Sequence, residues 1–202
     1  MESYSAGEAR MERYEVRLSG SGGQGLIFAG IILAEAAGIY DEKYVCQTQS
    51  YGPEARGGAS KAEVVISDRE IDYPKAIKPD LLLAMNQKSC DAYFFDLKPK
   101  GMLIIDSTFV KQLPTTRAIA IPFTQISREK LGKEIGANIV ALGALATLSG
   151  IVSLSSLEAA VRNRIPKGTE EFNKKALELG IEAAKEAMKV KAEQEYYEDS
   201  SD

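Results

Sequence analysis

The stretch that decides the fold is Gly20-Ser21-Gly22-Gly23-Gln24-Gly25. It follows an alternating segment, residues 14–19, that is typical of a strand, and it opens a segment, residues 24–38, that is apolar nearly all round. A strand, a glycine turn and a helix in this order present bare backbone N–H groups and the positive end of a helix to an anion. Gly20, Gly22 and Gly25 also fit the G-x-G-x-x-G spacing of dinucleotide-binding turns.

The residues after this turn argue against a dinucleotide. A dinucleotide fold places Asp or Glu at the end of the second strand, about 20 residues past the glycines, to bind the ribose hydroxyls. Residues 45–49 contain no acid, and Asp41 and Glu42 precede the strand and so belong to its other end. Gly23 is a further departure from the usual pattern. Two interpretations remain: a cradle for another anion or a cofactor tail, or a tight turn whose glycines allow close packing.

The order of the remaining segments predicts an α/β fold. We expect strands at 14–19, 44–48, 59–67, 81–85, within 101–106 and at 117–123. We expect helices at 24–38, 87–97 and 138–150, around Leu157, and from Thr169 to about Ala192. Ser155 or Ser156 is the expected cap of the helix around Leu157. Such alternation predicts a three-layer α/β/α domain with a mostly parallel sheet and a helical C-terminal part. A tight turn at 67–70 with a short return arm predicts that the sheet is mixed.

The domain boundaries are predicted from composition. Residues 1–12 form a polar lead-in, residues 13–192 a single domain, and residues 193–202 an acidic tail. The chain has 202 residues, of which 45% are hydrophobic and 27% charged, which is typical of a globular protein. It has no apolar stretch of the roughly 18–20 residues that cross a bilayer, and its first 13 residues lack the apolar core of a signal peptide. We therefore predict a cytoplasmic protein without a membrane partner.

Charge and residue usage exclude several classes of function. The net charge of −4 argues against a nucleic-acid-binding surface. The chain has no histidine, which removes Ser-His-Asp and Cys-His catalysis. Its two cysteines, Cys46 and Cys90, are far apart and cannot hold an iron–sulfur cluster or a zinc ion by themselves. We predict no catalytic residue and no metal site in this chain.

A second glycine-rich segment is predicted to lie at the same edge of the sheet as the first. It reads Gln49-Ser50-Tyr51-Gly52-Pro53-Glu54-Ala55-Arg56-Gly57-Gly58. In one interpretation it is a recognition loop in which Arg56 binds a carboxylate or phosphate. In the other it is an exposed loop whose Glu54 and Arg56 are merely solvated. Asn86 follows the strand at 81–85 and either caps the next helix or faces the shared crevice.

Taken together, these motifs resemble a known family. Ser19 to Gly25, Ala29-Gly30, Leu33-Ala34-Glu35-Ala36, the segment from Ser50 to Gly58, and Met85-Asn86 resemble the gamma subunit of 2-oxoacid:ferredoxin oxidoreductases. The resemblance runs from about Arg13 to Ala187. Within the family, the Ser-Gly-Gly-Gln-Gly turn and the Tyr-Gly-Pro-Glu-Ala-Arg-Gly-Gly loop look most like the 2-oxoglutarate branch rather than the pyruvate or indolepyruvate branches.

The resemblance implies a division of labour among subunits. Alpha and beta subunits would carry thiamine diphosphate, a ferredoxin-like subunit would carry iron–sulfur clusters, and the complex would convert a 2-oxoacid to an acyl-CoA while ferredoxin accepts the electrons. This chain would bind no cofactor alone.

From the helix-terminus argument, we expect its site to be a crevice that meets coenzyme A phosphates or a neighbouring subunit. The expected site residues are Gly20, Gly22, Gly23, Gln24, Gly25, Tyr51, Glu54, Arg56 and Asn86. Two other hypotheses stay open: a free-standing nucleotide-dependent oxidoreductase, and a non-enzymatic binding or assembly protein on the same fold.

Overall fold

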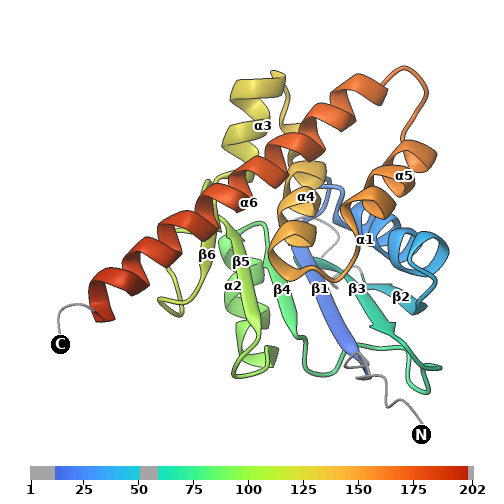
Figure 1. Cartoon of the computed structure of the whole chain (residues 1–202), viewed down its shortest axis with the longest axis horizontal. Coiled ribbons are helices and arrows are strands. Elements are labelled where there is room, and N and C mark those ends of the chain that lie inside the picture. The colour runs from blue at the N-terminus through green and yellow to red at the C-terminus, as the bar shows by residue number, and fades with distance from the viewer. Residues whose placement is uncertain (1–11, 51–58, 200–202) are drawn as a thin grey trace, which may run out of the picture.

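A computed structural model describes residues 12–50 and 59–199, and a six-stranded sheet forms its centre (Figure 1). The strands are β1 (Tyr14–Ser21), β2 (Tyr44–Ser50), β3 (Ala59–Ser67), β4 (Leu81–Ala84), β5 (Met102–Asp106) and β6 (Ile119–Ile121), in the order β2-β3-β1-β4-β5-β6. β1, β4, β5 and β6 pair in parallel, whereas β3 is antiparallel to both of its neighbours. The sheet is therefore mostly parallel and mixed, as the sequence predicted.

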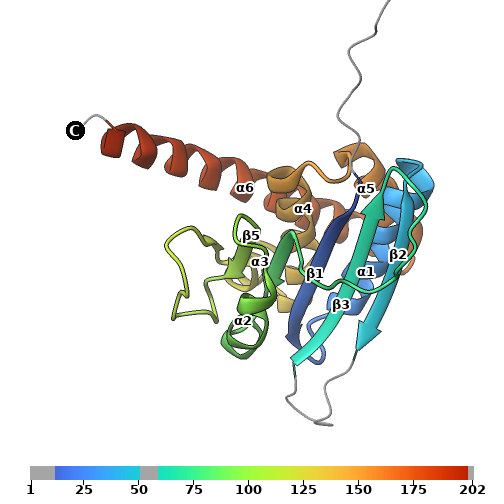
Figure 2. The same cartoon turned by 90° about the horizontal axis from the view of Figure 1, so that it is seen from below.

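Helices cover both faces of the sheet and make three layers (Figure 2). One face carries α1 (Leu26–Glu35), a π-helical turn (Ala36–Tyr40), α3 (Phe123–Leu131), a 3₁₀ turn (Glu134–Gly136), α4 (Ala137–Ser149), α5 (Leu154–Arg164) and α6 (Glu170–Asp199). The other face carries the smaller α2 (Gln87–Tyr93) and a 3₁₀ turn (Phe94–Asp96). The α/β/α architecture is thus confirmed.

The sequence of β4 explains why it lies at the centre of the sheet. All four of its side chains are buried, and alternate ones enter the two cores: Leu81 and Leu83 the larger core, Leu82 and Ala84 the smaller one. A continuous apolar run is what a parallel strand with both faces covered requires.

β1 differs from β4 on the smaller face, because it buries a charge there. The Arg17 guanidinium lies 2.7 Å from the Glu63 carboxylate, also bonds Asp96, and packs over the ring of Tyr93. The buried charge is therefore paired, as burial demands.

Close approach of two helices holds the large core together. A Cβ added to Gly180 in α6 would lie 1.9 Å from the Val140 carbonyl oxygen in α4, and one added to Gly143 would lie 2.5 Å from the Leu177 carbonyl oxygen. Only glycine fits at both places because the obstacle is backbone, which cannot rotate away. These two positions fix α4 against α6.

The segment after β3 differs from its prediction. The mixed pairing comes from β3, which is antiparallel to β1 and to β2, and residues 68–80 form no return strand. The Glu15 carboxylate accepts hydrogen bonds from the N–H groups of Ile77 (2.7 Å) and Lys78 (2.9 Å), so a side chain satisfies backbone donors that a strand partner would otherwise have bonded.

Three element ends also differ. The strand expected at 117–123 is only Ile119–Ile121, because Pro122 lacks the N–H that would extend the ladder. The N-cap of α5 is Ser153 rather than Ser155 or Ser156, and Asp41 orients it by accepting its N–H at 2.8 Å. The last helix continues to Asp199, past the end expected near residue 192. The domain boundaries stay a prediction.

Candidate functional site

The glycine turn lies where the parallel strands end. β1 ends at Ser21, and Asn86 follows β4, its parallel neighbour. The flanks of the second glycine-rich segment border the same edge, because Ala59 pairs with Ser21, and Ser50 pairs with Lys61. Residues 51–58, with the predicted site residues Tyr51, Glu54 and Arg56, lie outside the described residues, so their roles stay predictions.

The four predicted glycines of the turn differ in what requires them. A Cβ on Gly20 would lie 2.4 Å from Gln24 Oε1 and 2.7 Å from Leu26 Cδ1, so Gly20 permits close packing. Gly23 and Gly25 have φ values of 90° and 73°, which favour glycine. A Cβ on Gly22 would meet nothing within 4 Å, and its φ is not in the left-handed region. The fold therefore explains Gly20, Gly23 and Gly25 but does not require Gly22.

Gln24 and Asn86 shape the turn with their side chains. Gln24 Oε1 accepts the Ser21 N–H at 2.6 Å, and its Nε2 donates to the Met85 carbonyl at 3.4 Å. Asn86 Oδ1 accepts the Ser89 N–H at 2.8 Å and so caps α2, while its Nδ2 donates to Ser21 Oγ at 2.6 Å. The two alternatives for Asn86 are thus combined, since it caps a helix and also contacts the turn.

The helix after the turn begins with unsatisfied donors. Gly25 is its N-cap, and no side chain caps it. Its first backbone bond is the one from the Ala29 N–H to the Gly25 carbonyl, at 3.0 Å. Within residues 12–50 and 59–199, the N–H groups of Leu26, Ile27 and Phe28 have no hydrogen-bond partner. These donors and the positive end of the helix dipole favour an anion.

Two cavities flank the turn. One, of about 700 Å³, has Gly23, Asn86 and Phe109 among its lining residues. The other, of about 540 Å³, combines Gly25 and Phe28 with further residues from the C-terminal part, including Phe172, Lys133 and Arg164. The turn is therefore reachable from two sides.

Sequence reasoning missed the two cations of the smaller cavity. Lys133 lies between α3 and α4 and makes no ion pair in the described part of the chain, whereas Arg164 ends α5 and bonds the buried Glu35. No local motif marks either residue. Their place beside the turn depends on how the C-terminal helices pack.

The described residues offer little chemistry of their own. They contain no group of three or more His, Cys, Asp or Glu side chains that could hold a metal ion. Burial, and then the nearby Asp91 carboxylate, raise the pKa of the Cys90 thiol to about 11, which makes it a poor nucleophile. Among the same residues, no helix is both long and apolar enough to span a membrane.

Comparisons with known proteins identify the family to which the sequence is similar. The family model described as "Pyruvate ferredoxin/flavodoxin oxidoreductase" matches residues 15–183. The 2-oxoglutarate synthase subunit KorC of Methanocaldococcus jannaschii is 53% identical over 178 residues, which is 86% of this chain and 95% of that protein. The pyruvate synthase subunit PorC of Methanothermobacter marburgensis is 31% identical over 174 residues, which is 85% of this chain and 97% of that protein.

A solved structure has the same fold. The gamma subunit of a keto/oxoacid ferredoxin oxidoreductase from Geobacter sulfurreducens PCA superimposes with a TM-score of 0.79 and 49% sequence identity. The match covers 87% of this chain and 98% of that one. The likeness therefore extends over nearly the whole length of a separate gamma subunit.

Proposed function

The chain belongs to the pyruvate ferredoxin/flavodoxin oxidoreductase family, and from that premise we propose that it is the gamma subunit of a 2-oxoglutarate:ferredoxin oxidoreductase. The observation that carries the proposal is the 53% identity, over nearly full length, to a 2-oxoglutarate synthase subunit. Identity to the pyruvate synthase subunit is lower, at 31%, which favours 2-oxoglutarate over pyruvate as the substrate.

The chain's own inventory supports a shared enzyme. It has no histidine, and the described residues contain no metal-binding cluster. Alpha and beta subunits would supply thiamine diphosphate, a ferredoxin-like subunit would supply iron–sulfur clusters, and ferredoxin would accept the electrons released as 2-oxoglutarate becomes an acyl-CoA. The two cysteines are free, which fits a reducing, cytoplasmic compartment.

We assign the glycine edge of the sheet to the phosphates of coenzyme A. Three observations support this role: the N–H groups of Leu26 to Phe28 lack partners among the described residues, Gly22 faces open space, and Lys133 lines the adjoining cavity. Arg56, in the segment that joins β2 to β3 at this edge, would add a guanidinium.

Kinetics of the assembled complex test the coenzyme A role. Arg56→Ala should raise the apparent KM for coenzyme A about tenfold or more, because a charge-assisted contact contributes about 1.5–3 kcal/mol. Arg69→Ala is the matched control, since the Arg69 side chain is 61% exposed and lies past the opposite end of β3. If Arg56→Ala weakens only the assembly of subunits and leaves this KM unchanged, the edge is an interface and not an anion site.

Purification separates the gamma-subunit proposal from the two alternatives. A tagged chain taken from its own organism should bring down partner subunits with iron–sulfur absorbance. A chain that purifies alone and shows saturable NAD(P)H binding by fluorescence would instead be a free-standing oxidoreductase. Partners without iron–sulfur absorbance would support a binding or assembly protein.

A further inference from the structure

The last helix is longer than the body that it covers. The first half of α6 packs into the large core through Ala176, Leu177 and Ala184. Its second half projects past the β6 edge of the sheet (Figures 1 and 2). There Met188 and Val190 are 51% and 45% exposed. Most of the stability of a helix comes from packing its apolar face. The exposed apolar side chains of this projecting half can therefore pack against another protein surface.

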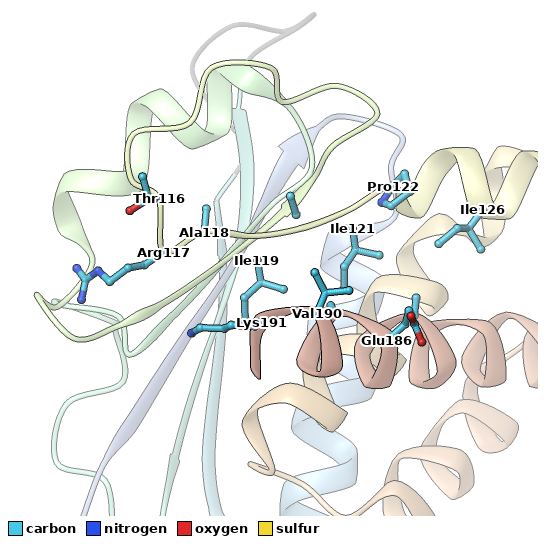
Figure 3. Close-up of a pocket in the computed structure, with 13 residues that line it drawn as sticks. Thr116, Arg117, Ala118, Ile119, Ile121, Pro122, Ile126, Glu186, Val190 and Lys191 are labelled. Atoms are coloured by element: carbon cyan, nitrogen blue, oxygen red, sulfur yellow. The ribbon is translucent and has the colours of Figure 1, made fainter. Parts of the chain in front are cut away.

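An apolar groove runs between the projecting half of α6 and strand β6. Its volume is about 700 Å³. Ile119 and Ile121 face Val190 across it (Figure 3), and Ala183 and Ala187 complete the wall formed by the helix. Small side chains on one wall and branched ones on the other leave room for side chains of a second chain.

One side of the groove is a free strand edge. β6 is the last strand of the sheet, and among the strands in the described residues it pairs only with β5. The Ser107 N–H donates to the Ile121 carbonyl at 3.1 Å, so the backbone groups of Ile121 point to β5. Because alternate residues of a strand point to opposite edges, the N–H and C=O of Ala120 point away from β5. An open edge beside a helix is the setting in which proteins add an extended peptide as a strand.

The two ends of the groove differ in charge. Arg117 and Lys191 lie toward one end and Glu186 toward the other (Figure 3). Arg117 donates to the Pro99 carbonyl at 2.8 Å, and among the side chains that the structure describes, in residues 12–50 and 59–192, no carboxylate forms an ion pair with it. Glu186 is already paired with Lys189, at 3.7 Å. The chain as a whole carries −4, so the Arg117 guanidinium is a local positive charge that favours an acidic group on the occupant.

We propose that this groove binds an extended apolar segment of another subunit, which adds to β6 at Ala120 and places an acidic side chain against Arg117. The inference rests on the proposed function, because it requires a multi-subunit complex. A second copy of the chain is a poorer occupant. It would bring its own β6 and flanking residues, 117–123, which contain no Asp or Glu.

Two substitutions on the same helix test the groove. In complex purified through a tag at the N-terminus of this chain, Val190→Asp should lower recovery of the partner subunits about tenfold or more, because it puts a charge at the centre of an apolar contact. Met188→Asp is the matched control, since Met188 is as exposed as Val190 but does not line the groove; it should change recovery less than about twofold. Equal losses for the two variants would overturn the proposal.

A third variant and an exchange measurement keep the test independent of folding. Ala120→Pro removes only the outward N–H, which an edge strand tolerates, and should also lower recovery. Amide hydrogens of residues 118–121 should exchange at least about tenfold more slowly in the wild-type complex than in the isolated chain. Unchanged exchange in an intact complex overturns the groove but leaves the proposed function standing. A chain that brings down no partner overturns both, and a homodimer that Val190→Asp dissociates would identify a second copy as the occupant.

Discussion

Gly25→Ala should lower the free energy of unfolding, whereas Gly22→Ala should leave it almost unchanged, although both residues lie in the same turn. Gly25 has φ 73°, and a Cβ there would lie 2.5 Å from Asn138 Nδ2. A left-handed non-glycine residue costs about 1–2 kcal/mol. Moving Asn138 also endangers its 3.2 Å hydrogen bond to the Gly25 carbonyl, which contributes about 0.5–1.5 kcal/mol. The free energy of unfolding should therefore fall by about 2–3 kcal/mol in Gly25→Ala.

Gly22→Ala should leave that free energy within about 0.5 kcal/mol of the wild type, because its Cβ meets nothing within 4 Å and its φ needs no glycine. Urea unfolding of the isolated chain, followed by circular dichroism, measures both values. In the assembled complex, Gly22→Ala should nevertheless raise the KM for coenzyme A, because its methyl group would occupy the space that the phosphates approach. Equal stabilities for the two variants would refute the structural argument, and an unchanged KM would refute the assignment of Gly22 to the anion site.

Two further predictions concern the fold. Gly180→Ala should destabilise the chain by about 2 kcal/mol, because a Cβ 1.9 Å from the Val140 carbonyl oxygen forces α6 away from α4; a melting temperature equal to the wild type's would contradict this packing. Stability should fall as pH rises from about 9 to about 12, because burial is the main cause that raises the pKa of Cys90 to about 11 and of Tyr14 to about 12. Both groups are neutral below their ordinary pKa values of 9.0 and 10.0, so their contribution is complete there and is lost as the unfolded chain releases protons that the folded chain retains. Urea midpoints across this range measure the loss, Tyr14→Phe should reduce the slope, and a flat profile would contradict the prediction.

Local patterns were enough to predict most of the architecture. The apolar run of β4 and the glycine turn before α1 each carry a physical requirement within a few residues. They predicted the layers, the mostly parallel sheet and the edge at which the turn lies. Asn86 was also found from its position alone, because a polar residue between a buried strand and a helix has few other uses.

Long-range contacts set the parts that the sequence did not predict. Asp41 accepts hydrogen bonds from Ser153 and from Ser156, 112 and 115 residues away, and so holds the start of α5 in place. The Glu15 carboxylate accepts hydrogen bonds from the N–H groups of Ile77 and Lys78, which are 62 and 63 residues away in the sequence. These bonds take the place of the strand pairing that was expected for the return arm. Lys133 and Asn138 line the cavity beside Gly25, and Asn138 bonds the Gly25 carbonyl from 113 residues away. No pattern of neighbouring residues records such contacts.

Substrate-dependent electron transfer by the purified complex tests the central claim most directly. The complex isolated through this chain should reduce ferredoxin when 2-oxoglutarate and coenzyme A are both present. We predict a kcat/KM for 2-oxoglutarate at least about tenfold above that for pyruvate. A complex that prefers pyruvate, or one that reduces NAD(P)⁺ without ferredoxin, would contradict the account.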